Sequence, residues 1–310
     1  MVMFDARVCE GANKLECTIL APTWNCKTPA DLNDFQLRSD MQKPPMVQDT
    51  ITESLYVVLR TALSQYSRYD RVQLDFINPS LQPLTRTSET IVSREDGDEL
   101  DAMERKLNHQ YLNKFDLGDR LHFMALWTTR SQLAKMRLMK YYWIAARSQS
   151  RQITDQQRDE ATLSAIQILK AEAQLVCSYL TQCFRWHISH FQFQPYVHIV
   201  RDLKLRPLQS LADEAWEALD HDFRARFENG PLDGEPVFKL LAKFVSDAWK
   251  VREKALRDSE QVTSEPWIVT EMQRLMHAGG DDNELECGDF EFNIDDFIAY
   301  PLSFDGFDHA

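Results

Sequence analysis

Apolar side chains recur at intervals of three and four residues along most of the chain between positions 51 and 276. This spacing places them on one face of an α-helix, and almost no segment shows the two-residue alternation of a half-buried β-strand. The pattern predicts an all-α fold, an irregular bundle of about seven to nine helices. The clearest helical patterns cover residues 50–62, 99–115, 119–147, 154–180, 211–223, 237–258 and 267–276.

The stretch of residues 184–207 lies between two of these long helical patterns and is rich in aromatic and histidine side chains. Pro195 lies inside it. Proline removes a backbone hydrogen-bond donor and clashes with the carbonyl four residues earlier, so we expect a kink near Phe191 or a break between two helices. The stretch is apolar enough to be buried, and its histidines make it a candidate for chemistry.

The chain divides into three segments by composition. Residues 1–50 contain four prolines and are expected to form a loop-rich N-terminal segment of the helical domain, which itself covers residues 51–278. Within that domain, the spacing of Thr50 to Glu53 and of Thr154 to Gln157 matches a capping box. In this arrangement each side chain bonds a free backbone N–H of the other residue's turn, so the two boxes predict helix starts.

The third segment, residues 279–310, is an acidic and aromatic tail with no lysine or arginine. Acidic residues alternating with aromatic ones are typical of disordered activation segments, in which charge keeps the rings solvated until they bind a coactivator. The alternative is a strap whose phenylalanines pack back on the helical body. The predicted partner-binding residues are Phe290, Phe292, Phe297 and Phe304.

The formal net charge of −13 argues against direct binding of nucleic acid, because a phosphate backbone requires a concentrated basic surface. The sequence contains no apolar run long enough for a membrane helix and no secretory signal at residues 1–10, so we expect an intracellular protein, nuclear or cytoplasmic. The six cysteines form no C-x-x-C pair or close Cys/His grouping. They are expected to be free, buried thiols, and neither a metal nor a cofactor is predicted.

The candidate chemical residues lie in the stretch of residues 184–207. His187 and His190 are three residues apart on one helical face, and Asp202 follows His198 by one turn. Asp202 could orient the His198 imidazole or pair with it in acid–base work, whereas the simpler interpretation is buried histidines bonded to the backbone. A metal site would need further ligands. The weak catalytic candidates are Arg185, His187, His190, His198 and Asp202.

Several short motifs occur in a characteristic order along the chain. They include residues 5–10 (DARVCE), 31–34 (DLND), 40–45 (DMQKPP), 52–53 (TE) and 133–138 (LAKMRL). A later string comprises Arg185-Trp186-His187, Phe191-Gln192, Leu203, Arg206-Pro207 and Ala215-Trp216. Together they resemble the regulatory, or middle homology, region of fungal-specific zinc-cluster transcription factors over residues 5–260. No single motif is specific, and their order carries the resemblance.

The resemblance implies a transcription-factor-like regulator of fungal specialised (secondary) metabolism. The sequence lacks the family's six-cysteine, two-zinc DNA-binding domain and the start of the regulatory domain, so we expect it to act through a protein partner, either a DNA-binding regulator or a coactivator, or through a small-molecule ligand in a helical pocket. A truncated gene product would also explain the difference. The alternative function is a cofactor-free enzyme of natural-product biosynthesis, a cyclase or pericyclase such as a Diels-Alderase, on a recruited scaffold.

Overall fold

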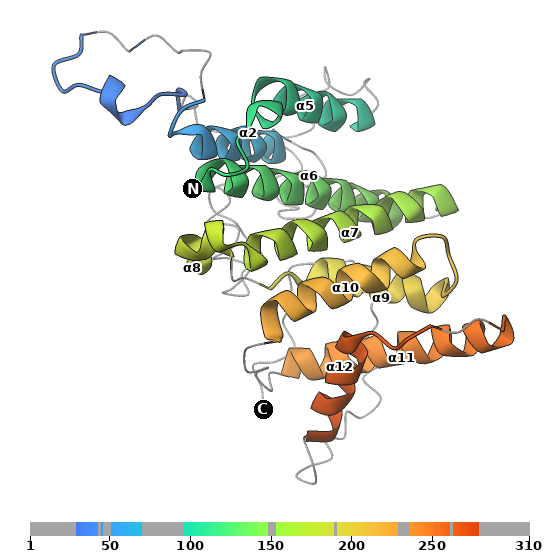
Figure 1. Ribbon diagram of the computed structural model, residues 1–310. Coiled ribbons are helices and arrows are strands. Elements are labelled where there is room, and N and C mark those ends of the chain that lie inside the picture. The colour runs from blue at the N-terminus through green and yellow to red at the C-terminus, as the bar shows by residue number, and fades with distance from the viewer. Residues whose placement is uncertain are drawn as a thin grey trace, which may run out of the picture. The chain divides into compact units, whose positions relative to one another are not determined.

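The computed structural model of the protein is built from helices, as Figure 1 shows. It describes residues 29–42, 45, 51–69, 96–147, 153–188, 191–228, 236–260 and 263–278. Within these ranges there are nine α-helices and three short 3-10 helices, and no strand. The predicted all-α class and helix number are therefore confirmed. None of the described helices combines the length and the apolar character that a membrane crossing needs.

The helices group into two compact units, and unit 1 holds the described residues up to Arg147. In its core, the leucines at positions 55, 59 and 63 of the first α-helix cluster with apolar residues of the next two α-helices. The core residues of unit 1 are Leu55, Leu59, Leu63, Leu100, Leu107, Leu112, Ala125, Leu126, Leu133 and Met136. Its elements are η1 (Asp34–Gln36), α2 (Leu55–Tyr69), α5 (Asp96–Gln110), η4 (Leu112–Lys114) and α6 (Arg120–Arg147).

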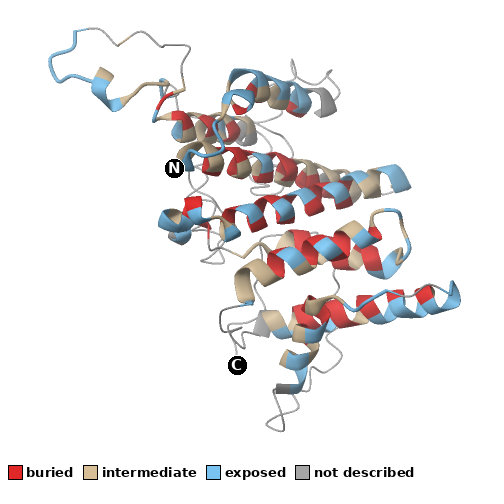
Figure 2. Ribbon diagram, in the orientation of Figure 1, coloured by how far each residue is buried: buried red, intermediate tan, exposed pale blue. Residues whose placement is uncertain are grey.

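Unit 2 holds the described residues from position 153 onward. Within it, α9 and α10 lie between α7 and α11 (Figure 1), and α12 packs against both α10 and α11. In Figure 2 the ribbons of the long helices of unit 2 each carry both buried and exposed positions. The elements are α7 (Asp155–Cys177), η5 (Tyr179–Phe184), α8 (Arg185–Ile188), α9 (Phe193–Leu205), α10 (Ala212–Phe227), α11 (Pro236–Asp258) and α12 (Trp267–Ala278).

The stretch of residues 184–207 breaks into two helices, as one of the two expectations for Pro195 stated. Helix α8 ends at Ile188, and α9 begins at Phe193. Pro195 is the third residue of α9, where the backbone N–H has no intrahelical acceptor, so its loss costs little. The break turns the chain so that the face of α9 carrying His198 and Asp202 packs against α7.

The predicted capping boxes have different outcomes. Thr154 accepts a bond from the Gln157 backbone, and the Gln157 side chain accepts one from the Thr154 backbone, so this box is confirmed. The other helix begins later than predicted, at Leu55. There Glu53 accepts a bond from the backbone of Asp34. The expected partner, Thr50, lies outside the described residues.

Two further predictions concern cysteines and segments. Cys177 and Cys183, the cysteines within the described ranges, are free but exposed, so the expectation of burial was wrong for them. Cys177 is the last residue of α7, and Cys183 lies in η5, beyond the packed faces.

The division of the chain into residues 1–50, 51–278 and 279–310 stays a prediction, and the tail lies outside the described residues.

Candidate functional site

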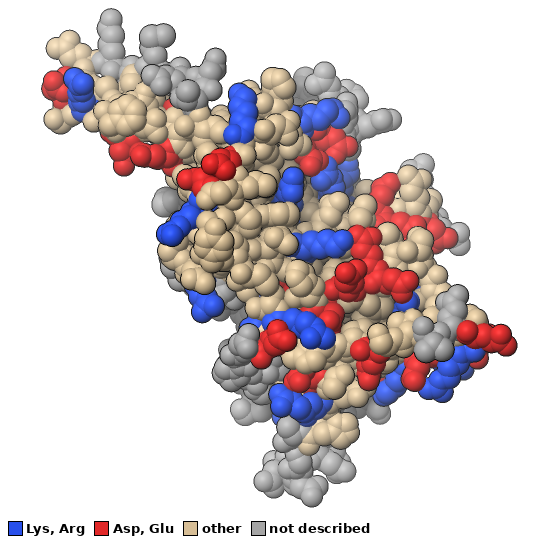
Figure 3. Space-filling view, viewed as in Figure 1, with Lys and Arg blue, Asp and Glu red and all other residues tan. Residues whose placement is uncertain are grey.

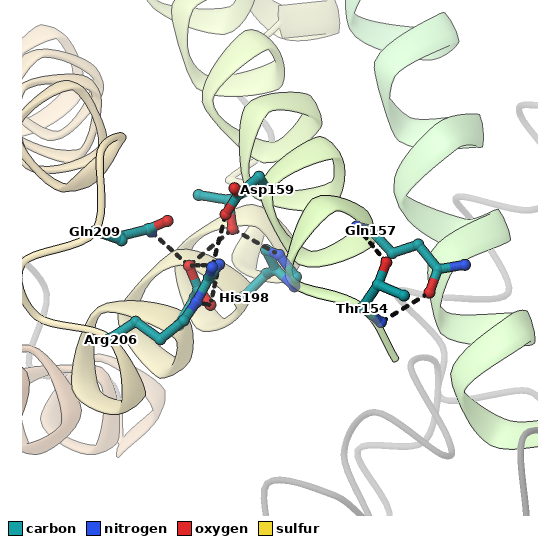
Figure 4. A network of polar contacts seen from close by, with 8 residues as sticks. Thr154, Gln157, Asp159, His198, Arg206 and Gln209 are labelled. Carbon is teal, nitrogen blue, oxygen red and sulfur yellow. Dashed lines mark hydrogen bonds and ion pairs between the residues drawn. The ribbon is translucent and has the colours of Figure 1, made fainter. Parts of the chain in front are cut away.

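A buried polar group between α7 and α9, which we call the Asp202 cluster, is centred on one carboxylate (Figure 4). Thr162 of α7 donates its hydroxyl to Asp202 at 3.0 Å. The guanidinium of Arg206 donates to both Asp202 oxygens, at 3.0 and 2.9 Å, and Gln209 donates at 2.5 Å. The cluster comprises Asp159, Thr162, His198, Asp202, Arg206 and Gln209.

Helical spacing brings these side chains together. His198, Asp202 and Arg206 follow one another at four-residue intervals, so they share one face of α9 and its C-terminal end. Arg206 follows the last residue of α9 and also donates to Asp159 of α7 at 2.7 Å. One arginine therefore joins the end of α9 to the first turns of α7.

His198 is held as a neutral imidazole. Burial, together with the positive charges of Arg201 and Arg206, lowers its pKa to about 3. Its Nε2 lies 3.4 Å from the Thr162 hydroxyl. Burial works against the charge of Arg206, but bonds to Asp159 and Asp202 outweigh it and raise the pKa of Arg206. The cluster thus combines a permanent cation with a histidine that does not gain a proton near neutral pH.

The chemistry of the Asp202 cluster follows from this geometry. A general base must reach the proton that it removes, and it works best with a pKa near the working pH. Asp202 is buried and already accepts from three side chains, and the His198 pKa lies far below neutrality. The arrangement is suited to fixing α9 against α7.

A second buried polar group, the Asp222 cluster, joins α7, α9 and α10. Tyr196 of α9 donates its hydroxyl to Asp222 at 2.7 Å. Arg226 donates to Asp222 at 3.1 Å and to Glu172 of α7 at 3.2 Å, and Gln192 donates to Glu172 at 2.8 Å. The side chains of Asp222, Arg226 and Glu172 are only 1%, 6% and 9% exposed. Arg226 therefore links α10 to α7, and Asp222 links α10 to α9.

The electrostatics of this cluster favour a charged arginine. Burial opposes the charge of Arg226, but the carboxylates of Asp222 and Glu172 outweigh burial and raise its pKa. Burial and the Asp222 carboxylate raise the pKa of Tyr196 well above its usual value, so this phenol stays protonated. The Phe191 ring adds a contact 5.8 Å from the Arg226 guanidinium carbon. A buried charge is stable only where all of its partners are in place, so this cluster favours one relative position of the three helices.

The aromatic side chains of the stretch of residues 184–207 form the apolar side of this junction. Phe191 lies 4.5 Å from Phe193 and 4.7 Å from Tyr196, measured between ring centroids. It also contacts Phe227 of α10 at 5.7 Å and Phe238 of α11 at 5.4 Å. These contacts tie the start of α9 to two neighbouring helices. Tyr196 is fully buried, whereas Phe191 and Phe193 are half-buried.

The structure brings together two of the predicted site residues, His198 and Asp202. Arg185 is exposed at the start of α8 and forms no bond with a described member of either cluster. His187 belongs to α8, with its side chain outside the described set, and His190 lies outside the described residues. The tail residues Phe290, Phe292, Phe297 and Phe304 also lie outside them. Their roles stay predictions.

Sequence reasoning missed most members of the two clusters. The pairs Asp202 with Arg206 and Asp222 with Arg226 each show the four-residue spacing of a helical ion pair, which is a usable signal. Their other partners are far away in sequence. Thr162 lies 40 residues before Asp202, and Glu172 lies 54 residues before Arg226. No local pattern in the sequence reveals these contacts.

The part of the chain that the structure describes contains no group of side chains suited to binding a metal ion. No set of three or more histidine, cysteine, aspartate or glutamate side chains gathers there in a way that could hold an ion. Within the Asp202 cluster, the oxygens of the carboxylate face donor groups of threonine, arginine and glutamine. A carboxylate surrounded by hydrogen-bond donors is a poor ligand set for a cation.

The sequence is similar to fungal proteins that are named as transcriptional regulators. It is 37% identical over 269 residues to "Transcriptional regulator AacuB" of Aspergillus aculeatus, covering 86% of this chain and 35% of that protein. It is 33% identical over 276 residues to "Transcriptional regulator nsrM" of Aspergillus novofumigatus, covering 88% of this chain and 36% of that protein.

A relative with lower sequence identity is also named as a transcription factor. The "Aurofusarin cluster transcription factor aurR2" of Gibberella zeae is 23% identical over 159 residues, which cover 51% of this chain and 24% of that protein. No protein-family model and no solved structure matches the chain. The chain thus spans about a third of the length of the two more similar relatives, and it is similar to proteins named as fungal transcriptional regulators along most of its own length.

Proposed function

We propose that these 310 residues act as the regulatory part of a transcriptional regulator of fungal specialised metabolism. The alignment with AacuB carries this proposal, because it runs through 86% of the chain at 37% identity. The names of nsrM and aurR2 support it independently. In this role the protein would work in the nucleus.

In this proposal the helical body binds a protein partner or a small molecule. Contact with DNA is made by polypeptide outside these 310 residues. The net charge of −13 supports this division, since phosphate contacts require clustered cations. The two polar clusters support it as well. Their buried carboxylates are bonded to donors from neighbouring helices, and networks of this kind favour one packing arrangement. A body with fixed packing presents a constant surface to a partner.

The tail, residues 279–310, supplies the partner contact in this proposal. Its aromatic residues lie among acidic ones, which is the composition of segments that dock rings on a coactivator. The residues expected to dock are Phe290, Phe292, Phe297 and Phe304.

Fusion of the 310 residues to a heterologous DNA-binding domain, with a reporter gene, tests this proposal. The intact fusion is expected to activate the reporter. Replacing the four docking phenylalanines by alanine should reduce activation to background, because the rings provide the apolar contact. The matched control replaces four other tail residues by alanine, namely Asn283, Gly288, Asn293 and Ser303. A silent intact fusion, or equal activation by both variants, would count against the proposal.

A further inference from the structure

Helix α11 carries an exposed stripe of cations in a protein that is acidic overall. Its members are separated by four, seven, four and three residues, which is the spacing of a single helical face. All of them are exposed. We call them the α11 stripe: Lys239, Lys243, Lys250, Lys254 and Arg257.

The stripe is only partly neutralised within the described residues. Lys250 lies 3.6 Å from Asp247, and Arg257 lies 2.7 Å from Glu253. Lys239, Lys243 and Lys254 make no ion pair with any residue that the structure describes. In Figure 3 the end of α11, at the lower right, shows blue and red side chains next to each other. The stripe therefore has capacity for further acidic groups along its length.

The sequence supplies a complementary segment close by. Residues 281–292 (DDNELECGDFEF) follow α12 almost directly and contain six acidic residues without a lysine or arginine. Helix α12 packs against α11, and the segment begins three residues after the last residue of α12. The acidic residues are Asp281, Asp282, Glu284, Glu286, Asp289 and Glu291.

The tether is long enough for the two to meet. With 23 residues, α11 is about 34 Å long at 1.5 Å per residue. The chain from the end of α12 to residue 292 spans up to about 46 Å when extended. Covalent attachment also raises the local concentration of the segment to the millimolar range, so individually weak ion pairs suffice.

We propose that residues 281–292 dock on the α11 stripe of the same molecule. Docking pairs the carboxylates of the segment with the exposed cations and holds Phe290 and Phe292 against the helical body. This contact is a property of the chain itself and does not depend on the proposed regulatory function. A protein or nucleic acid that binds the stripe would have to displace the segment.

Carbodiimide cross-linking of the full 310-residue chain, mapped by mass spectrometry, tests the docking. This reagent joins a lysine amine to a carboxylate in contact with it. At low salt, cross-links are expected between Lys239 or Lys243 and the carboxylates of residues 281–291. They should weaken several-fold at about 0.5 M salt, because exposed ion pairs are screened.

The variant K250E/K254E/R257E separates docking from mere tethering, since it keeps the amines of Lys239 and Lys243. Cross-links from these two lysines are expected to fall about fivefold or more, as several weak exposed pairs are lost together. The matched control K106E/K114E/K204E changes the net charge equally at exposed positions outside the stripe and should retain them. Cross-links unchanged by the stripe variant and by salt, or spread evenly over all exposed lysines, would overturn the proposal. Circular dichroism checks that both variants keep their helices.

Discussion

His198 lies inside unit 2 with a pKa lowered to about 3 by burial and by the charges of Arg201 and Arg206. The imidazole of an unfolded chain has a pKa near 6.5, so the unfolded state binds the proton more readily than the folded state. The stabilising effect of the neutral histidine is present above pH 6.5 and is lost as pH falls towards 3. Between pH 7 and pH 5 this loss amounts to about 2 kcal/mol.

We therefore expect the free energy of unfolding to fall more steeply with acidification in the wild type than in His198→Gln, by about 2 kcal/mol between pH 7 and pH 5. Urea denaturation at each pH measures the difference. Thr162→Val is the matched control, because it removes the hydroxyl beside His198 and keeps the imidazole. This control should keep the wild-type pH dependence. Identical pH dependence in His198→Gln and wild type would show that His198 is not a buried neutral group.

The two buried clusters also show what the sequence can indicate at this scale. Asp202 was predicted as a site residue because it follows His198 by one turn, and the structure places both in one cluster. Its contacts with Thr162 and with Gln209 depend on how α7 and the segment after α9 pack. Such partners are fixed by tertiary packing, so a pattern of three or four residues carries no information about them.

At the scale of elements, helix existence was predictable and helix ends were less so. The pattern of residues 119–147 predicts the helix α6 almost to the residue, because its apolar positions and Gly118 mark it clearly. The start of α2 was predicted at residue 50 and lies at Leu55. There Ser54 accepts from the backbone of Leu32, and Thr52 bonds Asp31, so contacts across 20 residues determine how the helix begins.

The Asp222 cluster is the point where three elements of unit 2 are joined. Asp222→Asn leaves Arg226 buried with one carboxylate and weakens the bond from Tyr196, so we expect a loss of about 3 kcal/mol of unfolding free energy. Glu217→Gln, at an exposed position of the same helix, is the control and should change stability by less than about 0.5 kcal/mol. Thermal or urea denaturation compares the two. Equal stability of Asp222→Asn and the control would mean that this junction does not hold the helices together.

At the scale of the molecule, the sequence motifs and the comparisons both show similarity to fungal transcriptional regulators. The motifs at residues 31–34 and 133–138 were read from their order, whereas the comparison with AacuB covers 269 residues. The physical chemistry of the described residues adds that the candidate pair His198 and Asp202 is buried and engaged with neighbouring side chains. The enzyme alternative stays a prediction, which conversion of a pathway intermediate by the pure protein would test.

The partner and ligand could not be predicted from the sequence, because their recognition depends on surfaces rather than on motifs. The acidic tail has the composition of a docking segment, but composition alone does not name what it binds. The α11 stripe depends both on the helical spacing of its cations and on the exposure of each of them.

Transcript profiling of a strain that lacks the gene for this protein tests the regulatory role most directly. The central claim predicts that transcripts of a set of biosynthetic genes fall in the deletion strain and recover when the gene is restored. The opposite result would be unchanged transcripts together with loss of a metabolite and accumulation of its precursor, which would identify a missing enzymatic step and contradict the regulatory role.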